Sequence, residues 1–430
     1  MQRSTLFLTL SVALLAGTLP ACQRQPTPET TPVTTPPPAS ASATAPAAAT
    51  TAAAQPATTP PTDFEQLANR VVTQNAGIKE GEVVLITGQA HDAELMEDLA
   101  VNVRKVGAFP IVLHDSDRMD KRLFFDVPAQ YDSQTDKAGL LLASNADAVI
   151  TLSDGTTENL FDGADPVRMA ARGKAGEAVS QAALKRRVRT IEIGNNLYPT
   201  PWRAQRYGMT EPDLAKTFWD GVNLDYAALQ THGEQVKAAL AGGDTVHVTN
   251  PNGTDLTFKI KGRPVLVSDG IVSEADRKAG GPAASAYLPA GEVYTTPVPG
   301  SAQGKVVVSK MFFRGKEVDD LTLTIAGGKV TAMTGSGPGF ADYKAAYDAV
   351  PDARKDDVGF IDLGINPNIK LPAASSVGTW VPAGSVTVGA GNNTWAGGDN
   401  TVAWTNTLFL PGSTVTLDDK PVVEAGTLKL

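Results

Sequence analysis

The chain has 430 residues, of which 42% are hydrophobic and 19% are charged, and its formal net charge is −9. This length allows about two or three domains with buried cores. The acidic balance argues against nucleic acid as a partner, because the longest basic run is Lys185-Arg186-Arg187. Cys22 is the only cysteine, so no intramolecular disulfide can form.

Residues 1–21 are predicted to be a secretory signal peptide. Arg3 precedes an apolar run from Leu6 to Leu19, which is short for a membrane span. The end of this segment, Leu19-Pro20-Ala21-Cys22, resembles the lipobox at which a bacterial signal is cleaved and the new N-terminal cysteine is acylated. We therefore expect a lipid anchor on Cys22 that holds the protein to the membrane bilayer of the cell envelope, with a lone thiol as the alternative.

Residues 22–62 are expected to form a disordered tether behind this anchor. They consist almost entirely of Pro, Thr, Ala, Ser and Gln, and so lack the large apolar side chains that offset the entropy of ordering. In a polyproline-like form the tether would reach on the order of 120 Å. By analogy with sorted lipoproteins, Gln23 after the cysteine favours the outer membrane, facing the periplasm, of a Gram-negative cell.

In residues 63–243, short apolar segments alternate with helical patterns. The predicted strands are residues 82–88, 110–114, 148–152 and 188–193, and the clearest predicted helices are residues 93–106 and 167–184. This rhythm predicts an α/β N-terminal domain built on an open parallel sheet with helices on both faces.

Capping residues and glycines set the expected helix boundaries in this half. Thr62 and Glu65 form a Thr-x-x-Glu capping box that is predicted to open the first helix. Thr210 marks another helix start. Residues 214–240 are then expected to be one helix or two, broken near Gly233.

The histidines are interpreted as structural. His91 and His114 follow two predicted strands, where open α/β sheets place their ligand contacts. No third ligand is spaced to join them in a metal site. His232 falls on a predicted helix and His247 on an alternating strand, so neither suggests a functional site.

Residues 244–430 are predicted to form a second domain of the α+β class that is rich in strands. A hairpin is expected around the turn Asn250-Pro-Asn-Gly253. The predicted strands are residues 245–249, 254–260, 306–309, 321–325 and 329–333, and a helix is expected near residues 341–350.

Glu292 is the leading candidate for a functional residue in this second half. It follows the turn Pro289-Ala-Gly291, which places it at the start of a predicted strand. A carboxylate held in this way is a good ligand for a hard metal ion. A solvated charge or a salt bridge is the alternative for a glutamate at the end of a strand.

Several segments match motifs of a known family. They are Tyr198-Pro-Thr-Pro-Trp-Arg-Ala204, Val246 to Phe258, Leu288-Pro-Ala-Gly-Glu-Val293 and Ile361-Asp-Leu-Gly-Ile-Asn-Pro367. Through them the chain from Ala68 onward resembles the aminopeptidase T family of metal-dependent, leucyl-type exopeptidases. The resemblance implies a pair of divalent ions, such as zinc, cobalt or manganese, that activate a bridging water for attack on a peptide bond. It also implies peptides as ligands and a homodimer as the assembly.

The resemblance further implies where the metal ligands should stand. Glu292 matches the first family ligand, and Asp362 replaces a second glutamate on a stem one methylene shorter. Thr387 stands where the family has a histidine, and Ala403 and Thr405 stand where it has a closing His-x-Asp pair. All four histidines precede Glu292, so no shift of the alignment in the C-terminal part restores an imidazole.

Three hypotheses follow from these replacements. The first is an aminopeptidase T-like lipoprotein whose metal site is degenerate and holds no metal, because affinity depends on the number of deprotonated ligands. The second keeps an atypical metallo-aminopeptidase, in which Glu292 and Asp362 bind a single oxygen-liking ion. The third is a non-catalytic lipoprotein that binds peptides or another small ligand, or acts as a scaffold.

Overall fold

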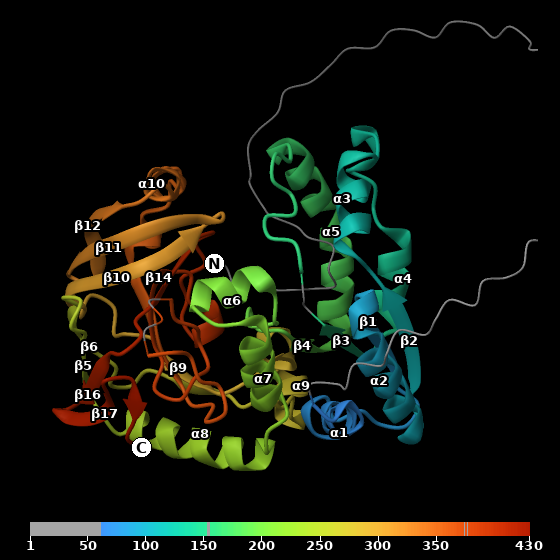
Figure 1. Cartoon of the computed structure of the whole chain (residues 1–430), viewed down its shortest axis with the longest axis horizontal. Coiled ribbons are helices and arrows are strands. Elements are labelled where there is room, and N and C mark those ends of the chain that lie inside the picture. The colour runs from blue at the N-terminus through green and yellow to red at the C-terminus, as the bar shows by residue number, and fades with distance from the viewer. Residues whose placement is uncertain (1–61, 153–154, 374, 376) are drawn as a thin grey trace, which may run out of the picture.

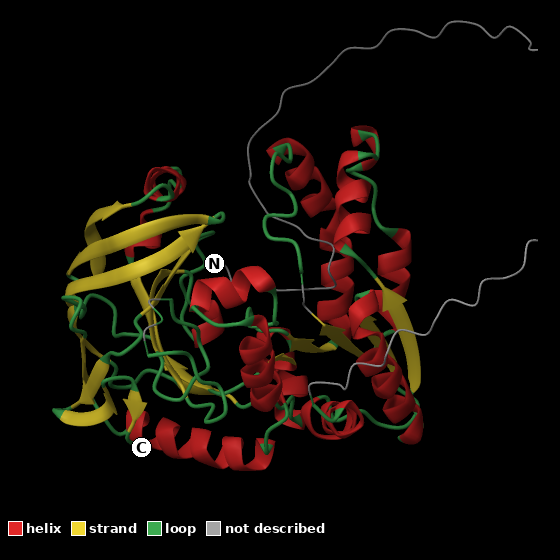
Figure 2. Cartoon of the chain, viewed as in Figure 1, coloured by secondary structure: helices red, strands yellow, loops and turns green. Residues whose placement is uncertain are grey.

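The computed structural model describes residues 62–152, 155–373, 375 and 377–430. The expected signal peptide, the lipidation site at Cys22 and nearly all of the expected tether lie outside these residues. Figure 1 shows the described chain as two lobes, and Figure 2 shows that helices dominate the first lobe and strands the second. In the described part of the chain, no helix combines the length and the apolar character needed to cross a membrane.

The first lobe is built on a parallel sheet, sheet A, with the strand order β2-β1-β3-β4-β8. Its strands are β1 (Val83–Gly88), β2 (Phe109–His114), β3 (Ala148–Leu152), β4 (Arg189–Ile193) and β8 (Ser285–Leu288). The helices around it are α1 (Phe64–Arg70), α2 (Ala93–Lys105), α3 (Asp117–Phe125), α4 (Lys137–Asn145) and α5 (Pro166–Arg186). The predicted open parallel sheet is thereby confirmed.

Both faces of sheet A are covered because its central strands are apolar on both sides. Ile86 and Ile150 belong to a core that includes Leu95 and Leu99 of α2. Leu85 and Val149 point to the opposite face and pack in a second cluster. Its other members are Ala143 and Ala146 of α4 and its C-terminal end, and Val179, Ala183 and Val188 of α5 and its C-terminal end. The sheet is therefore the middle layer of three.

Two predicted helix boundaries are wrong. The first helix is capped by Asp63, whose side chain accepts a hydrogen bond from the N–H of Gln66 at 2.9 Å, whereas Thr62 accepts one from the Asn223 side chain. The predicted break near Gly233 lies instead at Asn223, between α7 (Glu211–Val222) and α8 (Tyr226–Ala241). Gly233 sits within α8, where an added Cβ would stand 2.6 Å from Val267, so this glycine serves close packing.

The second lobe contains two antiparallel sheets. Sheet B has the order β12-β11-β10-β6-β5-β16-β17-β18, and sheet C has the order β15-β14-β13-β9-β7. The strands of sheet B are β5 (Thr245–Thr249), β6 (Asp255–Lys259), β10 (Gln303–Phe313), β11 (Lys316–Ala326), β12 (Lys329–Ser336), β16 (Thr414–Leu417), β17 (Lys420–Glu424) and β18 (Thr427–Leu428). Those of sheet C are β7 (Val265–Ser268), β9 (Glu292–Thr295), β13 (Val358–Gly364), β14 (Val386–Gly391) and β15 (Thr405–Phe409).

The second half of the sequence contributes one strand to the sheet of the first lobe. The expected domains were residues 63–243 and 244–430, yet β8 lies in the second range and pairs with β4 of sheet A. The short helix α9 (Glu274–Ala279) precedes β8, and α10 (Phe340–Asp348) belongs to the second lobe. From β8 the chain passes directly into β9 of sheet C, so one short segment belongs to both lobes.

Arg189 on β4 anchors sheet A to the N-terminal helical region. Its side chain is fully buried and donates hydrogen bonds to the carbonyl oxygens of Ala76 (2.6 Å) and Gly77 (2.8 Å). It also forms an ion pair with Glu82, which Arg277 contacts from the other side at 3.3 Å. A buried arginine that satisfies several acceptors leaves all of them unpaired when it is removed.

We expect Arg189→Met to lower the free energy of unfolding by about 3 kcal/mol, because it removes the buried donor of two carbonyl groups and one of the partners of the Glu82 carboxylate. Urea denaturation of the purified protein measures this change. Lys216→Met is the matched control, since Lys216 pairs with Asp220 on the exposed surface of α7 and its loss should cost under about 0.5 kcal/mol. Equal effects of the two substitutions would show that Arg189 is no anchor.

Candidate functional site

Glu292 and Asp362 lie on neighbouring strands of sheet C. Glu292 is the first residue of β9, as the turn pattern predicted, and is paired with Gly364 of β13, while Asp362 is paired with Tyr294. Residues two apart on a strand share a face, so the two carboxylates are diagonal neighbours with Cα atoms about 7–8 Å apart. Both are buried, with exposed fractions of 1% and 0%.

The structure brings Thr387 into this group and leaves Ala403 and Thr405 outside it. Thr387 is paired with Asp362 on the adjacent strand β14 and is fully buried. Thr405 is paired with Gly391, four residues from Thr387 and thus about 13 Å along the strand. Ala403 precedes β15 and is exposed.

A set of aromatic side chains, here called the aromatic cluster, packs on the face of sheet C that carries the two carboxylates. Its members are Tyr294, Phe360, Trp380, Trp395 and Phe409. Trp395 packs on Tyr294 at 5.0 Å and on Phe360 at 4.7 Å between ring centroids, and Trp380 lies between Phe360 (6.0 Å) and Phe409 (5.2 Å). Phe360 is on the same face of β13 as Asp362, and Phe409 is paired with Thr387.

The sequence predicts a polar-aromatic loop around residues 392–406, which includes Trp395, but it does not predict the aromatic cluster as a unit. Strand alternation places Phe360 beside Asp362, so that part of the signal was present. Trp380 and Trp395 come from loops between the strands, where no periodicity indicates which face a side chain will cover. Trp395 belongs to a single helical turn, Thr394–Ala396, that folds back over the sheet.

The loop of residues 392–406 is held by hydrogen bonds within the loop and to neighbouring backbone carbonyl groups. Asn393 donates to the Gly359 carbonyl at 3.1 Å and Asn400 to the Arg354 carbonyl at 2.7 Å. Asn392 accepts hydrogen bonds from both the backbone and the hydroxyl of Thr394. These amides therefore hold turns in place, as is usual for asparagine in loops.

The donor set on this face is smaller than a two-metal centre requires. Zinc takes four ligands, and harder cations take six or more oxygens. Across residues 62–152 and 155–430, apart from positions 374 and 376, no three His, Cys, Asp or Glu side chains gather in a metal-binding arrangement. Glu292 and Asp362 therefore supply two carboxylates beside a neutral threonine, which does not fit a pair of divalent ions.

The histidines lie away from sheet C. His91 contacts the ring of Tyr198 at 5.9 Å between centroids, and His114 ends β2 in sheet A. His247 approaches Asp255 at 2.8 Å on the β5–β6 hairpin of sheet B, and His232 lies on α8. This distribution leaves the carboxylate pair without an imidazole from the described histidines.

A groove of about 470 Å³ lies between α6 (Pro201–Tyr207) and the β10–β11 hairpin, at the junction of the lobes. Arg206 lies over the ring of Trp202 at 4.8 Å and that of Phe312 at 4.2 Å, and it forms an ion pair with Glu158. Burial lowers the pKa of Arg206, while Glu158 acts in the opposite direction. The charged and aromatic residues that line the groove are Glu158, Trp202, Arg206, Tyr207, Lys310, Phe312 and Glu317.

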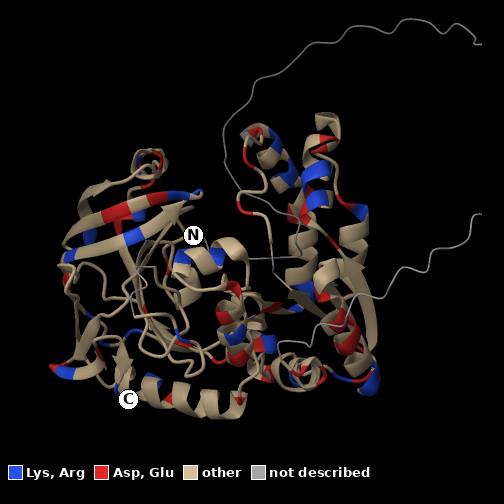
Figure 3. Cartoon of the chain, in the orientation of Figure 1, with Lys and Arg blue, Asp and Glu red and all other residues tan. Residues whose placement is uncertain are grey.

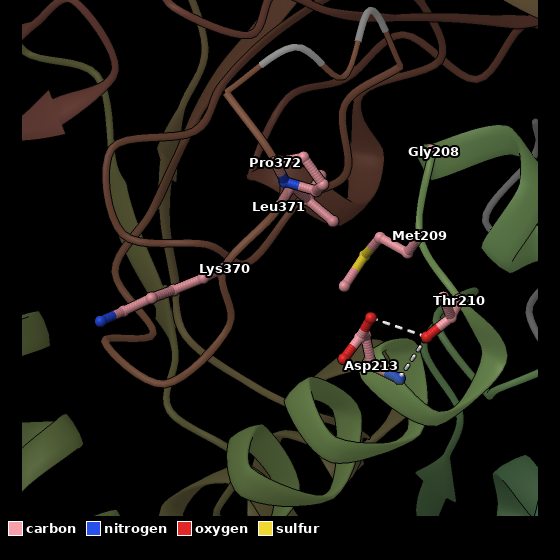
Figure 4. A pocket seen from close by; sticks show the side chains of 7 residues that line it. All are labelled: Gly208, Met209, Thr210, Asp213, Lys370, Leu371 and Pro372. Atoms are coloured by element: carbon pink, nitrogen blue, oxygen red, sulfur yellow. Dashed lines mark hydrogen bonds between the residues drawn. The ribbon is translucent and has the colours of Figure 1, made fainter.

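A second hollow of about 590 Å³ adjoins this groove at residues 208–213 and 370–372. In Figure 4, Met209 and Leu371 form its apolar part, while Lys370 points away. Thr210 caps α7 by accepting a hydrogen bond from the N–H of Asp213 at 3.2 Å, which confirms the predicted helix start. The polar groups shown there are thus engaged in a helix cap.

We expect Gly389→Ala to disrupt the aromatic cluster. An added Cβ would stand 2.0 Å from the ring of Phe360, and such overpacking costs about 1–3 kcal/mol of unfolding free energy. Near-ultraviolet circular dichroism should report the displaced tryptophans, and urea denaturation the lost stability. Gly242→Ala is the control, since its Cβ would meet only carbonyl oxygens at 3.5 Å; an unchanged Gly389→Ala spectrum would contradict tight packing there.

Comparisons with known proteins agree with the fold. The family model described as thermophilic metalloprotease (M29) matches residues 61–338, which is more than half of the chain. Wild-type AmpT from Thermus thermophilus superposes with a TM-score of 0.63 and 15% sequence identity, covering 85% of this chain and 99% of that chain. The 2,5-dihydroxypyridine dioxygenase from Pseudomonas putida KT2440 superposes with a TM-score of 0.53 and 16% identity, covering 85% and 96% of the two chains.

No curated protein matches the sequence. At 15–16% identity the two solved structures establish a shared fold, which confirms the expected combination of an α/β half and a β-rich half. The family match rests on the sequence itself and confirms the family expected from the motifs. The chain therefore belongs to the thermophilic metalloprotease (M29) family.

Proposed function

We propose that this protein is a lipid-anchored, metallo-aminopeptidase-like member of the M29 family whose peptidase site is degenerate, and that it binds short peptides without cleaving them. The observation that carries the proposal is the burial of Glu292 and Asp362 on the sheet face that also carries the aromatic cluster. A bound metal pair needs more ligands than this face provides, and a peptide substrate needs access to them.

The extent of the family match supports this proposal. The matched region includes Glu292 and ends at residue 338, before Asp362 and Thr387. The family resemblance in the sequence places the remaining ligands beyond that point, where this chain keeps one carboxylate at Asp362 and carries threonine or alanine at the other positions. Loss of imidazole and carboxylate donors should weaken metal binding strongly, while sheet C keeps its pairing through main-chain hydrogen bonds.

The groove beside α6 supports peptide binding. A short peptide carries an ammonium group at one end and a carboxylate at the other. The groove is lined by two ion pairs, Arg206 with Glu158 and Lys310 with Glu317, and the charged ends of a peptide would exchange into these pairs beside the rings of Trp202 and Phe312. Mixed polar and aromatic lining of this volume suits a ligand of a few residues.

The cell-envelope location rests on the N-terminal sequence. The lipobox-like segment ends at Cys22, and about forty residues of Pro- and Thr-rich chain precede the first described residue. A tether of that composition would keep both lobes clear of the bilayer to which the acyl chains attach. Gln23 favours the outer membrane of a Gram-negative cell, facing the periplasm.

We expect the purified protein to hold well under one zinc, cobalt or manganese ion per chain and to leave leucyl anilides intact. Inductively coupled plasma mass spectrometry and a chromogenic assay with each metal added measure the two properties. Glu292→Ala should change neither. Stoichiometric metal with chelator-sensitive turnover that disappears in Glu292→Ala would instead establish an atypical enzyme that uses Glu292 and Asp362.

Peptide binding is tested separately by isothermal titration calorimetry with unlabelled di- and tripeptides. Trp202→Ala should weaken binding about tenfold or more, as the loss of a central aromatic contact does. Lys216→Ala, on the outer surface of α7, is the matched control. A protein that is inert and also binds no peptide would favour the scaffold hypothesis.

We expect Cys22→Ser to abolish acylation and to move the protein from the membrane fraction to the soluble fraction of the envelope. Metabolic labelling with a palmitate analogue, followed by fractionation, measures both effects. Ser40→Cys combined with Cys22→Ser is the control, because it restores one thiol outside the lipobox. Labelling of that control, or of Cys22→Ser itself, would contradict an anchor at Cys22.

A further inference from the structure

Two aromatic rings fix the position of Arg206 in the groove beside α6. Its side chain is 13% exposed and lies over the ring of Trp202 at 4.8 Å and over that of Phe312 at 4.2 Å. Rings that cover a guanidinium leave its in-plane N–H groups for other contacts, and the fork of these groups matches the two oxygens of a carboxylate. Arg206 is therefore oriented to receive a carboxylate.

The carboxylate that Arg206 binds in this structure belongs to the chain itself. Arg206 Nη2 donates to Oε1 of Glu158, and no second hydrogen bond joins these two side chains within the described structure. Glu158 lies in the segment between β3 and α5, and its side chain is 32% exposed. A partly exposed ion pair contributes little stability, so a ligand carboxylate that places both oxygens on Arg206 can replace Glu158.

A turn that contacts the β10–β11 hairpin brings Glu158 to this position. Asn159, the next residue, adopts φ = +53°, and Gly315 at the turn of the hairpin adopts φ = +78°. A Cβ on Gly315 would overlap the side-chain amide of Asn159 and would stand 3.1 Å from Glu158 Oε1. The internal carboxylate thus comes from neither of the elements that carry the two rings, and its withdrawal would leave α6 and β10 in place.

The two sides of the groove differ in the sign of their excess charge. On the α6 side, Arg203 also lies over the Trp202 ring, at 4.4 Å, so two arginines stand against one glutamate. On the hairpin side, Lys310 has two acidic partners, Glu317 and Asp319, the latter at 3.7 Å. Figure 3 shows basic residues on α6 and both signs of charge along the hairpin strands. A peptide has the matching polarity when its carboxylate lies toward α6 and its ammonium group toward the hairpin.

We propose that the groove recognises the free carboxyl end of a short peptide, that Arg206 binds this carboxylate, and that Glu158 is an internal competitor which the ligand displaces. This inference rests on the peptide binding proposed above and adds the direction of the peptide and the chemical group that is recognised. It defines the ligand class as peptides with an unblocked C-terminus. A peptide that lacks this carboxylate leaves the pair of Arg206 and Glu158 in place.

The test compares trialanine with trialanine amide by isothermal titration calorimetry on the detergent-solubilised full chain. In the unsubstituted protein the acid should bind more tightly than the amide. In Glu158→Gln, which keeps the size of the side chain and removes the competing charge, the ratio of the two dissociation constants should grow about tenfold. Arg206→Gln should bring this ratio close to one, and Arg206→Lys should restore only part of it, because lysine lacks the planar fork.

Glu424→Gln is the matched control and should leave the ratio unchanged. Glu424 ends β17, where it pairs with Lys429, and β6, β5 and β16 separate this strand from β10 in sheet B. Circular dichroism of each variant separates loss of binding from loss of folding. A ratio that neither Glu158→Gln nor Arg206→Gln changes would overturn the recognition of the carboxyl end and leave peptide binding standing. Failure of every folded protein in the series to bind either peptide would overturn peptide binding itself, and this inference with it.

Discussion

The placement of Glu292 depends on one close backbone approach. Gly291 adopts φ = +127°, and a Cβ at this position would stand 2.9 Å from the main-chain nitrogen of Asn366. Asn366 also donates its side-chain amide to the carbonyl of Ala290 at 2.7 Å, and Asn195 donates to Pro289 at 2.8 Å. Only glycine accepts such a conformation and such contact without strain. This turn leads the chain from β8 of sheet A into β9 of sheet C, and it fixes Glu292 at the first position of β9.

This backbone contact explains how the fold can form without the full set of metal ligands that the family resemblance implies. The junction is held by asparagine amides, main-chain hydrogen bonds and one glycine, none of which requires a metal ion. The carboxylates at the junction share their sheet face with aromatic rings from several strands and loops, and buried aromatic packing stabilises a sheet face strongly. Aromatic packing therefore stabilises sheet C on the face where the family resemblance places metal ligands.

Local sequence patterns predicted most elements because each depends on neighbouring residues. The predicted strand 148–152 is β3 itself, and the predicted strand start at Glu292 is correct. Long-range features were not predictable in this way: β8 joins sheet A across almost one hundred residues from β4, and Gly233 serves a contact with Val267 rather than a helix break. At the site, Glu292, Asp362 and Thr387 converge, whereas Thr405 is displaced because motif alignment does not fix strand register.

The two regions of interest in this structure lie on different elements, so a change in one does not alter the other directly. The carboxylate pair belongs to sheet C, and the groove belongs to α6 and the β10–β11 hairpin. Substitutions at sites without shared partners act additively. A substitution at the carboxylate pair should therefore leave the groove unchanged, because none of the side chains that line the groove belongs to the pair.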